Sequence, residues 1–240
     1  MNTDATSAHR YAVYFAPNPG SLGWLAGSHW LGRCAALLQP LHQLDIEGVA
    51  AEDLARLTAA PRRYGWHGTL KAPFAPGPGV DWLTLHHAVQ ELAQSLRAFT
   101  MPPLQVERID DFLALTPAPS HPANAALRDA ASACVTRLQP LAAPLSEAAL
   151  ARRRAAGLTP RQDELLQRWG YPFVLDEFRF HMSITGSLSQ ASPEVQALVF
   201  DAAQEFFSDL PTLQFNSLAL FAEPTSGADF MLLDHLELGA

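Results

Sequence analysis

The chain has 240 residues, of which 48% are hydrophobic and 17% charged, and its formal net charge is −8. This length fits one large domain or two small ones, with ample apolar material for a core. The negative charge argues against binding to long nucleic acid, which requires many phosphates to be neutralised. No apolar run reaches the roughly 20 residues that cross a bilayer, and the N-terminus lacks a signal-peptide pattern, so we expect a cytoplasmic protein without membrane contact.

The first half of the chain predicts strands around two helices. We expect a strand over residues 10–16, a helix over 22–38 that three glycines loosen, and an alternating strand over 64–70. A helix with a regular apolar face begins at Asp81, and two strands follow at 104–109 and 111–116. The paired strands lie at hairpin distance, which favours antiparallel pairing.

The second half predicts more helix. One helix spans 122–138, and two more lie between 144 and 170, the second opened by a capping box at Thr159–Gln162. A strand over 178–184 precedes a helix that begins at Ser192-Pro193, and strands follow at 212–221 and 230–237. Cys34 and Cys134 have no paired spacing, which predicts neither a disulfide nor a zinc site, and we expect Cys134 to be an inert buried thiol.

Three short segments recur in the same order along the chain. Residues 64–70 (YGWHGTL) align without a gap with 178–184 (FRFHMSI), 101–106 with 210–215, and 111–115 with 229–233. The offsets of 114, 109 and 118 residues are nearly constant. We interpret this pattern as an internal duplication of a strand–helix–strand–strand unit.

The duplication predicts an α+β fold with two lobes in a single domain, each lobe a mainly antiparallel sheet with helices. Lobe 1 spans approximately residues 1–120, a helical connector or insertion 121–172, and lobe 2 173–240. We expect the active site in the cleft between the lobes. The connector either covers this cleft as a lid or packs against a lobe.

The two repeated histidine segments carry the predicted chemistry. Alternate side chains of a strand share a face, so His67 lies beside Thr69, and His181 beside Ser183. One neutral imidazole can accept a proton from an attacking hydroxyl while the other, protonated, donates one to the leaving oxygen. The two hydroxyls can donate hydrogen bonds to phosphate oxygens. Because the copies are nearly equivalent, either His can be the base.

Two cations accompany these motifs. Lys71 lies two residues beyond Thr69, and Arg179 two residues before His181, so either could bind the phosphate of a substrate, although a surface ion pair is an equal alternative. The other histidines have no partner motif, and the chain holds no Gly-rich phosphate loop. We therefore expect no metal and no cofactor. The expected partner is a small phosphorylated or cyclic-phosphate metabolite.

The motifs His67-Gly68-Thr69-Leu70 and His181-Met182-Ser183-Ile184 resemble the two H-x-[ST]-hydrophobic motifs of the 2H phosphoesterase superfamily. Residues 63–74, 178–186 and 10–17 are similar to one branch, often encoded beside phosphonate-degradation genes. The resemblance implies a bilobal, metal-independent phosphoric diester hydrolase with His67 and His181 as acid and base. It also implies a cyclic ribose phosphate or cyclic nucleotide as substrate.

Two other functions stay open. One is an RNA-end-processing 2′,3′-cyclic phosphodiesterase or 2′-5′ ligase, which predicts a basic channel to the cleft. The other is a non-catalytic binder of a phosphorylated metabolite. The sequence does not predict the oligomeric state.

Overall fold

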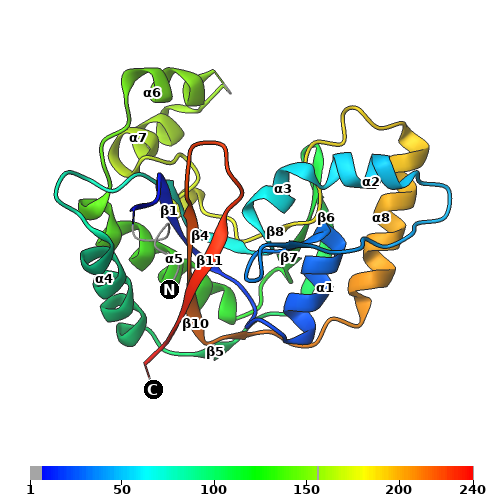
Figure 1. Cartoon of the computed structure of the whole chain (residues 1–240), viewed down its shortest axis with the longest axis horizontal. Helices are drawn as coiled ribbons and strands as arrows, with labels where there is room; N and C mark the ends of the chain where they lie inside the picture. Colours follow the sequence, from blue (N-terminus) through cyan, green and yellow to red (C-terminus); the bar gives the residue numbers. More distant parts are fainter. Residues whose placement is uncertain (1–6, 156, 240) are drawn as a thin grey trace.

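The computed structural model describes residues 7–155 and 157–239, with helices packed around one large antiparallel sheet (Figure 1). Every strand pair of this sheet is antiparallel. The predicted α+β class is therefore confirmed. The strands follow one another across the sheet in the order β11 (Met231–Glu237), β10 (Ser217–Glu223), β1 (Arg10–Phe15), β4 (Gly68–Phe74), β8 (Met182–Ser183), β7 (Phe112–Pro117) and β6 (Leu104–Ile109).

The strand order interleaves the elements that follow the two His segments in the sequence. The hairpin β6–β7 follows the His67 segment in the chain, yet β7 pairs with β8 of the second His segment, with Ala114 opposite Ser183. The hairpin β10–β11, which follows the second His segment, joins the other side of the sheet, where β10 pairs with β1 and β1 with β4. The central contact pairs Gly68 with Met182. Both His segments and the hairpins that follow them thus contribute strands to one continuous sheet.

One face of the sheet carries the main core. Four helices pack against this face and complete the core: α1 (Leu22–Leu31), α4 (Trp82–Ser95), α5 (Ala123–Leu138) and α8 (Pro193–Ser208). In α4 the buried positions Leu85, Val89 and Leu92 recur at helical spacing, as the sequence predicts. The apolar side chains of both His segments, Trp66, Leu70, Phe180, Met182 and Ile184, are buried in the same core, which fixes both segments to it.

The predicted connector forms α5, α6 (Glu147–Arg154) and α7 (Pro160–Trp169). The capping box at Thr159 and Gln162 is confirmed, since each side chain bonds the backbone of the other residue. Helix α5 packs on β4, whereas α6 and α7 project at one end of the molecule (Figure 1). The remaining short elements are α2 (Ala51–Leu57), α3 (Ala59–Tyr64), η2 (Gln139–Leu141), η3 (Leu175–Glu177), β2 (Arg33–Cys34), β3 (Gln39–Pro40), β5 (Phe99–Thr100) and β9 (Gln214–Phe215).

Several predicted boundaries differ from the structure. The helix expected over 22–38 ends at Leu31, because Gly32 with φ 76° forms a left-handed C-cap. The strand expected over 64–70 begins only at Gly68, since Tyr64 ends α3 and Gly65 turns the chain with φ 82°. The second His strand is shortened to Met182–Ser183. Among the described residues, no helix combines the length and apolarity that a membrane crossing requires.

Candidate functional site

The pairing of β4 with β8 brings the four predicted motif residues together. Gly68 lies opposite Met182, so His67 and Thr69 flank one member of this pair and His181 and Ser183 flank the other. Cross-strand neighbours have Cβ atoms about 4.5–5.5 Å apart. The site therefore combines two imidazoles and two hydroxyls on one face of the sheet.

A glycine allows this approach of the two strands. A Cβ atom at Gly68 would lie 2.5 Å from the ring of Phe180 and 3.4 Å from the carbonyl oxygen of His181. Phe180 is buried in the main core on the opposite face of the sheet. The absence of a side chain at position 68 thus lets the aromatic ring pack there while the two imidazoles face the other way.

Each imidazole is oriented by the same local hydrogen bond. Nδ1 of His67 lies 2.8 Å from the carbonyl oxygen of Gly65, and Nδ1 of His181 lies 2.9 Å from that of Arg179. A carbonyl oxygen only accepts, so Nδ1 carries the proton and Nε2 is the basic atom of each neutral ring. Nε2 of His67 lies 3.1 Å from Oγ1 of Thr69, whose hydroxyl can donate to it.

Burial keeps both rings neutral. It lowers the pKa of His67 to about 4, against the opposing hydrogen bond to Gly65, and His181 would lower it further when it is itself protonated. Burial also lowers the pKa of His181 below its ordinary value. The ring of Tyr14 stacks on His67 with centroids 3.8 Å apart. Tyr14 is fully buried, and its hydroxyl has no hydrogen-bond partner in the described part of the chain.

A cavity of about 360 Å³ adjoins this face of the sheet. Its wall includes Thr69, His181 and Arg179, together with Gln162 of α7 and Tyr171 just after that helix. The side chain of Arg179 is exposed. His67 and Ser183 are not part of this wall, but Thr69, which is, lies within hydrogen-bond distance of Nε2 of His67. The connector thus contributes Gln162 and Tyr171 to the wall of the cavity.

Lys71, the other predicted phosphate-binding cation, lies on the opposite face of the sheet from Thr69. Tyr14 pairs with Thr69 but Val13 with Lys71, so a β-bulge in β4 turns Lys71 to the face that α5 covers. Its Nζ donates to Oε1 of Gln139 at 2.9 Å, and burial lowers its pKa to about 8. The structure therefore does not bring Lys71 beside Thr69 and His181. Cys134 is buried nearby, as predicted, and burial raises its pKa to about 12.

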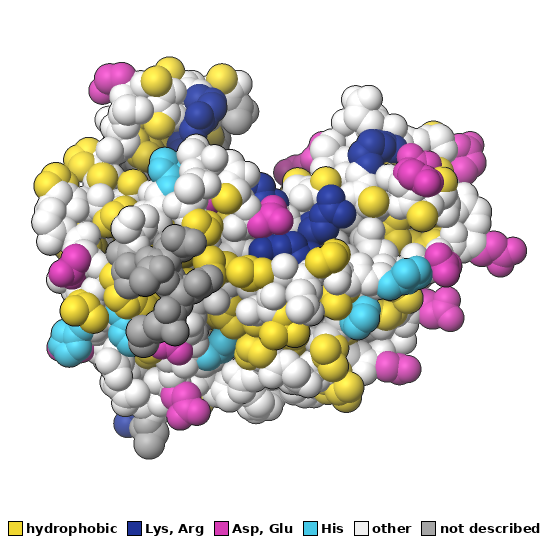
Figure 2. All heavy atoms as spheres, in the orientation of Figure 1, with side chains coloured by type: hydrophobic (Ala, Val, Ile, Leu, Met, Phe, Trp, Pro, Cys, Tyr) yellow, Lys and Arg dark blue, Asp and Glu magenta, His cyan; other side chains and the backbone are white. Residues whose placement is uncertain are grey.

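A second, larger cavity of about 900 Å³ borders the first one. The two cavities share the wall residues Ala72, Tyr171 and Val174. Among the described residues, its wall holds a single acid, Glu223, and five side chains of Lys and Arg: Arg10, Arg63, Lys71, Arg152 and Arg153. Figure 2 shows Lys and Arg side chains in the hollow between α6–α7 and the side of the molecule that carries α2 and α3.

Sequence reasoning missed this arginine cluster and Tyr14. Arg10 and Glu223 lie 213 residues apart in the chain and meet only through the pairing of β1 with β10. The sequence signal that could have pointed to Tyr14 is its position on the strand predicted over residues 10–16. Within residues 7–155 and 157–239, no group of three or more His, Cys, Asp or Glu side chains is placed to hold a metal ion.

Fold and site together define an α+β protein in which two histidines directly precede the adjacent central strands β4 and β8, beside a cavity rich in cations. Residues 69–231 match the family described as "Protein of unknown function (DUF1045)", and the chain belongs to this family. It is 38% identical over 237 residues to the ribose 1,5-bisphosphate phosphokinase PhnN of Janthinobacterium sp. (strain Marseille), covering 96% of this chain and 51% of the relative. It is 39% identical over 223 residues to the protein of the same name from Laribacter hongkongensis (strain HLHK9), covering 93% and 50%.

These relatives correct one prediction. The sequence motifs imply a phosphoric diester hydrolase, but both curated relatives are named as phosphokinases, so the predicted enzyme class is contradicted. The chain spans about half the length of these relatives.

Proposed function

We propose that this chain binds a phosphorylated ribose metabolite at His67 and His181, and that the two imidazoles transfer protons at its phosphate. One observation carries the proposal. Both rings are fixed by the same bond from Nδ1 to the carbonyl two residues earlier, and they directly precede the adjacent strands β4 and β8, which pair at Gly68 and Met182. This arrangement leaves two basic Nε2 atoms on one face of the sheet, as an acid–base pair requires.

The surroundings of the two rings support different roles. His67 is stacked under Tyr14, and its low pKa keeps the ring in the neutral form that can accept a proton. His181 lines the cavity, where a bound phosphate dianion raises the pKa of the imidazole and suits it as the acid. Thr69 and Ser183 supply hydroxyl donors for phosphate oxygens, and Arg179 at the cavity wall supplies positive charge.

The ligand class follows from the relatives. Ribose 1,5-bisphosphate is the compound in their names, and the acidic chain suits a metabolite better than RNA. The PhnN name and the resemblance to a branch encoded beside phosphonate-degradation genes support a role in phosphonate metabolism. The three repeated segments support an origin by duplication, with the site between the two copies, as in the 2H superfamily.

Phosphorus NMR of the full chain tests the proposal. Ribose 5-phosphate and ribose 1,5-bisphosphate are each incubated with the protein, with and without ATP and Mg²⁺. We expect one of them to be converted, and His67→Ala and His181→Ala to lose at least ~10²-fold in rate, as the loss of a general acid or base predicts. His87→Ala is the matched control, because its side chain is 71% exposed on α4. Unchanged rates in both site variants would refute the proton-transfer role.

A second candidate function is a non-catalytic binder. It is favoured by the hydroxyl of Thr69, which lies within hydrogen-bond distance of Nε2 of His67, a ring that is not part of the cavity wall. A binder would show calorimetric affinity that depends on Thr69 and His181, with no conversion of either compound.

A further inference from the structure

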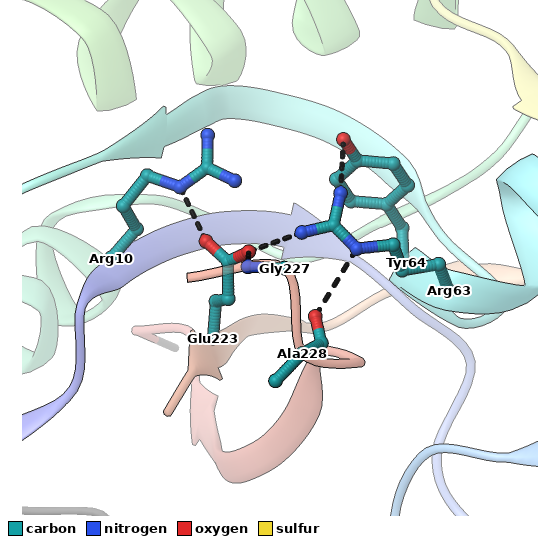
Figure 3. Close-up of polar contacts among 6 residues, drawn as sticks. All are labelled: Arg10, Arg63, Tyr64, Glu223, Gly227 and Ala228. Carbon is teal, nitrogen blue, oxygen red and sulfur yellow. Dashed lines mark hydrogen bonds and ion pairs between the residues drawn. The ribbon is translucent and has the colours of Figure 1, made fainter. Parts of the chain in front are cut away.

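Glu223 holds two arginines in a buried ion-pair cluster (Figure 3). Its fully buried side chain accepts hydrogen bonds from Nε of Arg10 at 2.5 Å, from Nη2 of Arg63, and from the backbone N–H of Gly227 at 2.9 Å. Burial raises the pKa of Glu223, but these hydrogen bonds and the two positive charges outweigh it and hold the pKa below its usual value. The carboxylate is therefore an ionised anchor for both guanidinium groups.

The two arginines differ in how many guanidinium nitrogens remain without a partner once Glu223 is bound. Arg63 also donates from Nε to the carbonyl oxygen of Ala228 and from Nη1 to the hydroxyl of Tyr64, so all of its nitrogens are used. Arg10 is held only through Nε, and its two terminal nitrogens have no partner in the described part of the chain. In Figure 3 neither of them is joined to another drawn residue by a dashed line. A structural role accounts for Arg63, but it leaves the paired donors of Arg10 unexplained.

Arg153 of α6 adds a third positive charge to the same cavity wall. Its guanidinium lies 5.7 Å from the ring centre of Tyr171, and it forms no ion pair within residues 7–155 and 157–239. Burial lowers the pKa of Arg153, against the opposing effect of Tyr171, and the charges of Arg152 and Arg10 lower it further. Arg153 and Arg10 line the same cavity. The next residue, Arg154, instead pairs with Asp163 at 2.6 Å.

The cluster is short of negative charge. The wall that carries Arg10, Arg63 and Arg153 holds one carboxylate, Glu223, which pairs with Arg10 and Arg63 only, and Lys71 on the same wall bonds only a neutral amide. Like charges held together in a half-buried wall repel one another unless an anion neutralises them. A guanidinium with two free terminal nitrogens matches two oxygens of a phosphate. This cavity adjoins the histidine cavity at Ala72, Tyr171 and Val174, which places the two candidate phosphate positions next to each other.

We propose that Arg10 and Arg153 bind a second phosphate group, so that the ligand of this protein is a sugar phosphorylated at two positions. The inference rests on the proposed function, which places the first phosphate at His181. In this arrangement the two terminal nitrogens of Arg10 donate to two oxygens of the second phosphate, and Arg153 contacts the same phosphate from α6.

Isothermal calorimetry at constant ionic strength tests this assignment with ribose 1,5-bisphosphate, ribose 1-phosphate and ribose 5-phosphate. The measured quantity is the advantage of the bisphosphate over the tighter-binding monophosphate. Arg153→Gln removes one cation. Arg10→Lys keeps a charge beside Glu223 but loses the two-nitrogen donor. Arg154→Gln is the matched control on the same helix, because Arg154 is 42% exposed and lies outside the cavity wall.

We expect the wild type to bind the bisphosphate at least about tenfold tighter than either monophosphate, the scale of a charge-assisted hydrogen bond. Arg153→Gln and Arg10→Lys should each remove most of this advantage, and Arg154→Gln should keep it. The proposal is refuted if the wild type shows no advantage, or if the advantage persists in both site variants.

Inorganic pyrophosphate separates this outcome from a failure of the proposed function. If no ribose phosphate binds, the proposed function fails. Pyrophosphate binding that Arg153→Gln weakens by about tenfold would then still support the anion site. No pyrophosphate binding at about millimolar concentration would overturn the anion site as well.

Discussion

Acid should destabilise the folded protein through His67. The pKa of this imidazole is about 4 in the folded chain, because burial penalises the charged ring, and about 6.5 in the unfolded chain, where water solvates it. Between these values the unfolded chain binds more protons than the folded one, so the free energy of unfolding falls as the pH falls. The stabilisation is fully present above pH 6.5 and is lost as the pH falls to about 4. Its full size is roughly 3 kcal/mol.

Urea unfolding followed by tryptophan fluorescence, from about pH 7.5 down to about pH 4.5, measures this effect in the wild type and in His67→Asn. Asparagine retains an N–H group for the carbonyl of Gly65 but does not titrate. Other groups, His181 among them, remain in both proteins and cancel in the comparison. The wild type should lose about 2–3 kcal/mol more than the variant over this range. Identical slopes in the two proteins would refute the assignment of a buried, neutral imidazole at position 67.

Two further substitutions test the packing around the site. Lys71→Met should leave the free energy of unfolding unchanged or raise it by about 1–3 kcal/mol, because it removes a buried cation without a carboxylate partner; a clear loss in urea unfolding would contradict this. Gly68→Ala should destabilise by about 1–3 kcal/mol and weaken ribose phosphate binding, because its Cβ would meet the ring of Phe180 at 2.5 Å. Adding Phe180→Leu to Gly68→Ala should restore part of the stability and part of the ribose phosphate binding. A double variant that is as unstable and binds as weakly as Gly68→Ala would show that the clash lies elsewhere.

Local sequence signals predicted most of the elements. The cap residues Asp81, Thr159 and Ser192 all begin helices, and in each case the side chain accepts the expected backbone hydrogen bond. Alternation predicted the buried faces of both His segments, with Trp66 and Met182 in one core. These features depend on neighbours within a few residues, which is why the sequence alone reveals them.

The arrangement of the strands could not be predicted in this way. The duplication suggested that each hairpin belongs with its own copy, but β7 pairs with β8 across about 70 residues of chain. The bulge between Thr69 and Lys71 depends on the register against β1, and it moves Lys71 to the opposite face from the one that alternation predicts. The cluster of Arg10 and Glu223 likewise depends on a long-range register.

The same strand order explains how two nearly equal motifs acquire unequal surroundings. On the β4 side, β1 is the neighbour, and its Tyr14 covers the ring of His67. On the β8 side, β7 is the neighbour, and the ring of Phe112 lies 5.7 Å from the ring of His181, beside the cavity. One imidazole is therefore shielded and neutral, while the other faces the place where a phosphate would bind. Since an acid–base pair works only when its members differ in protonation, this difference between neighbouring strands is what supports separate roles for two copies of one motif.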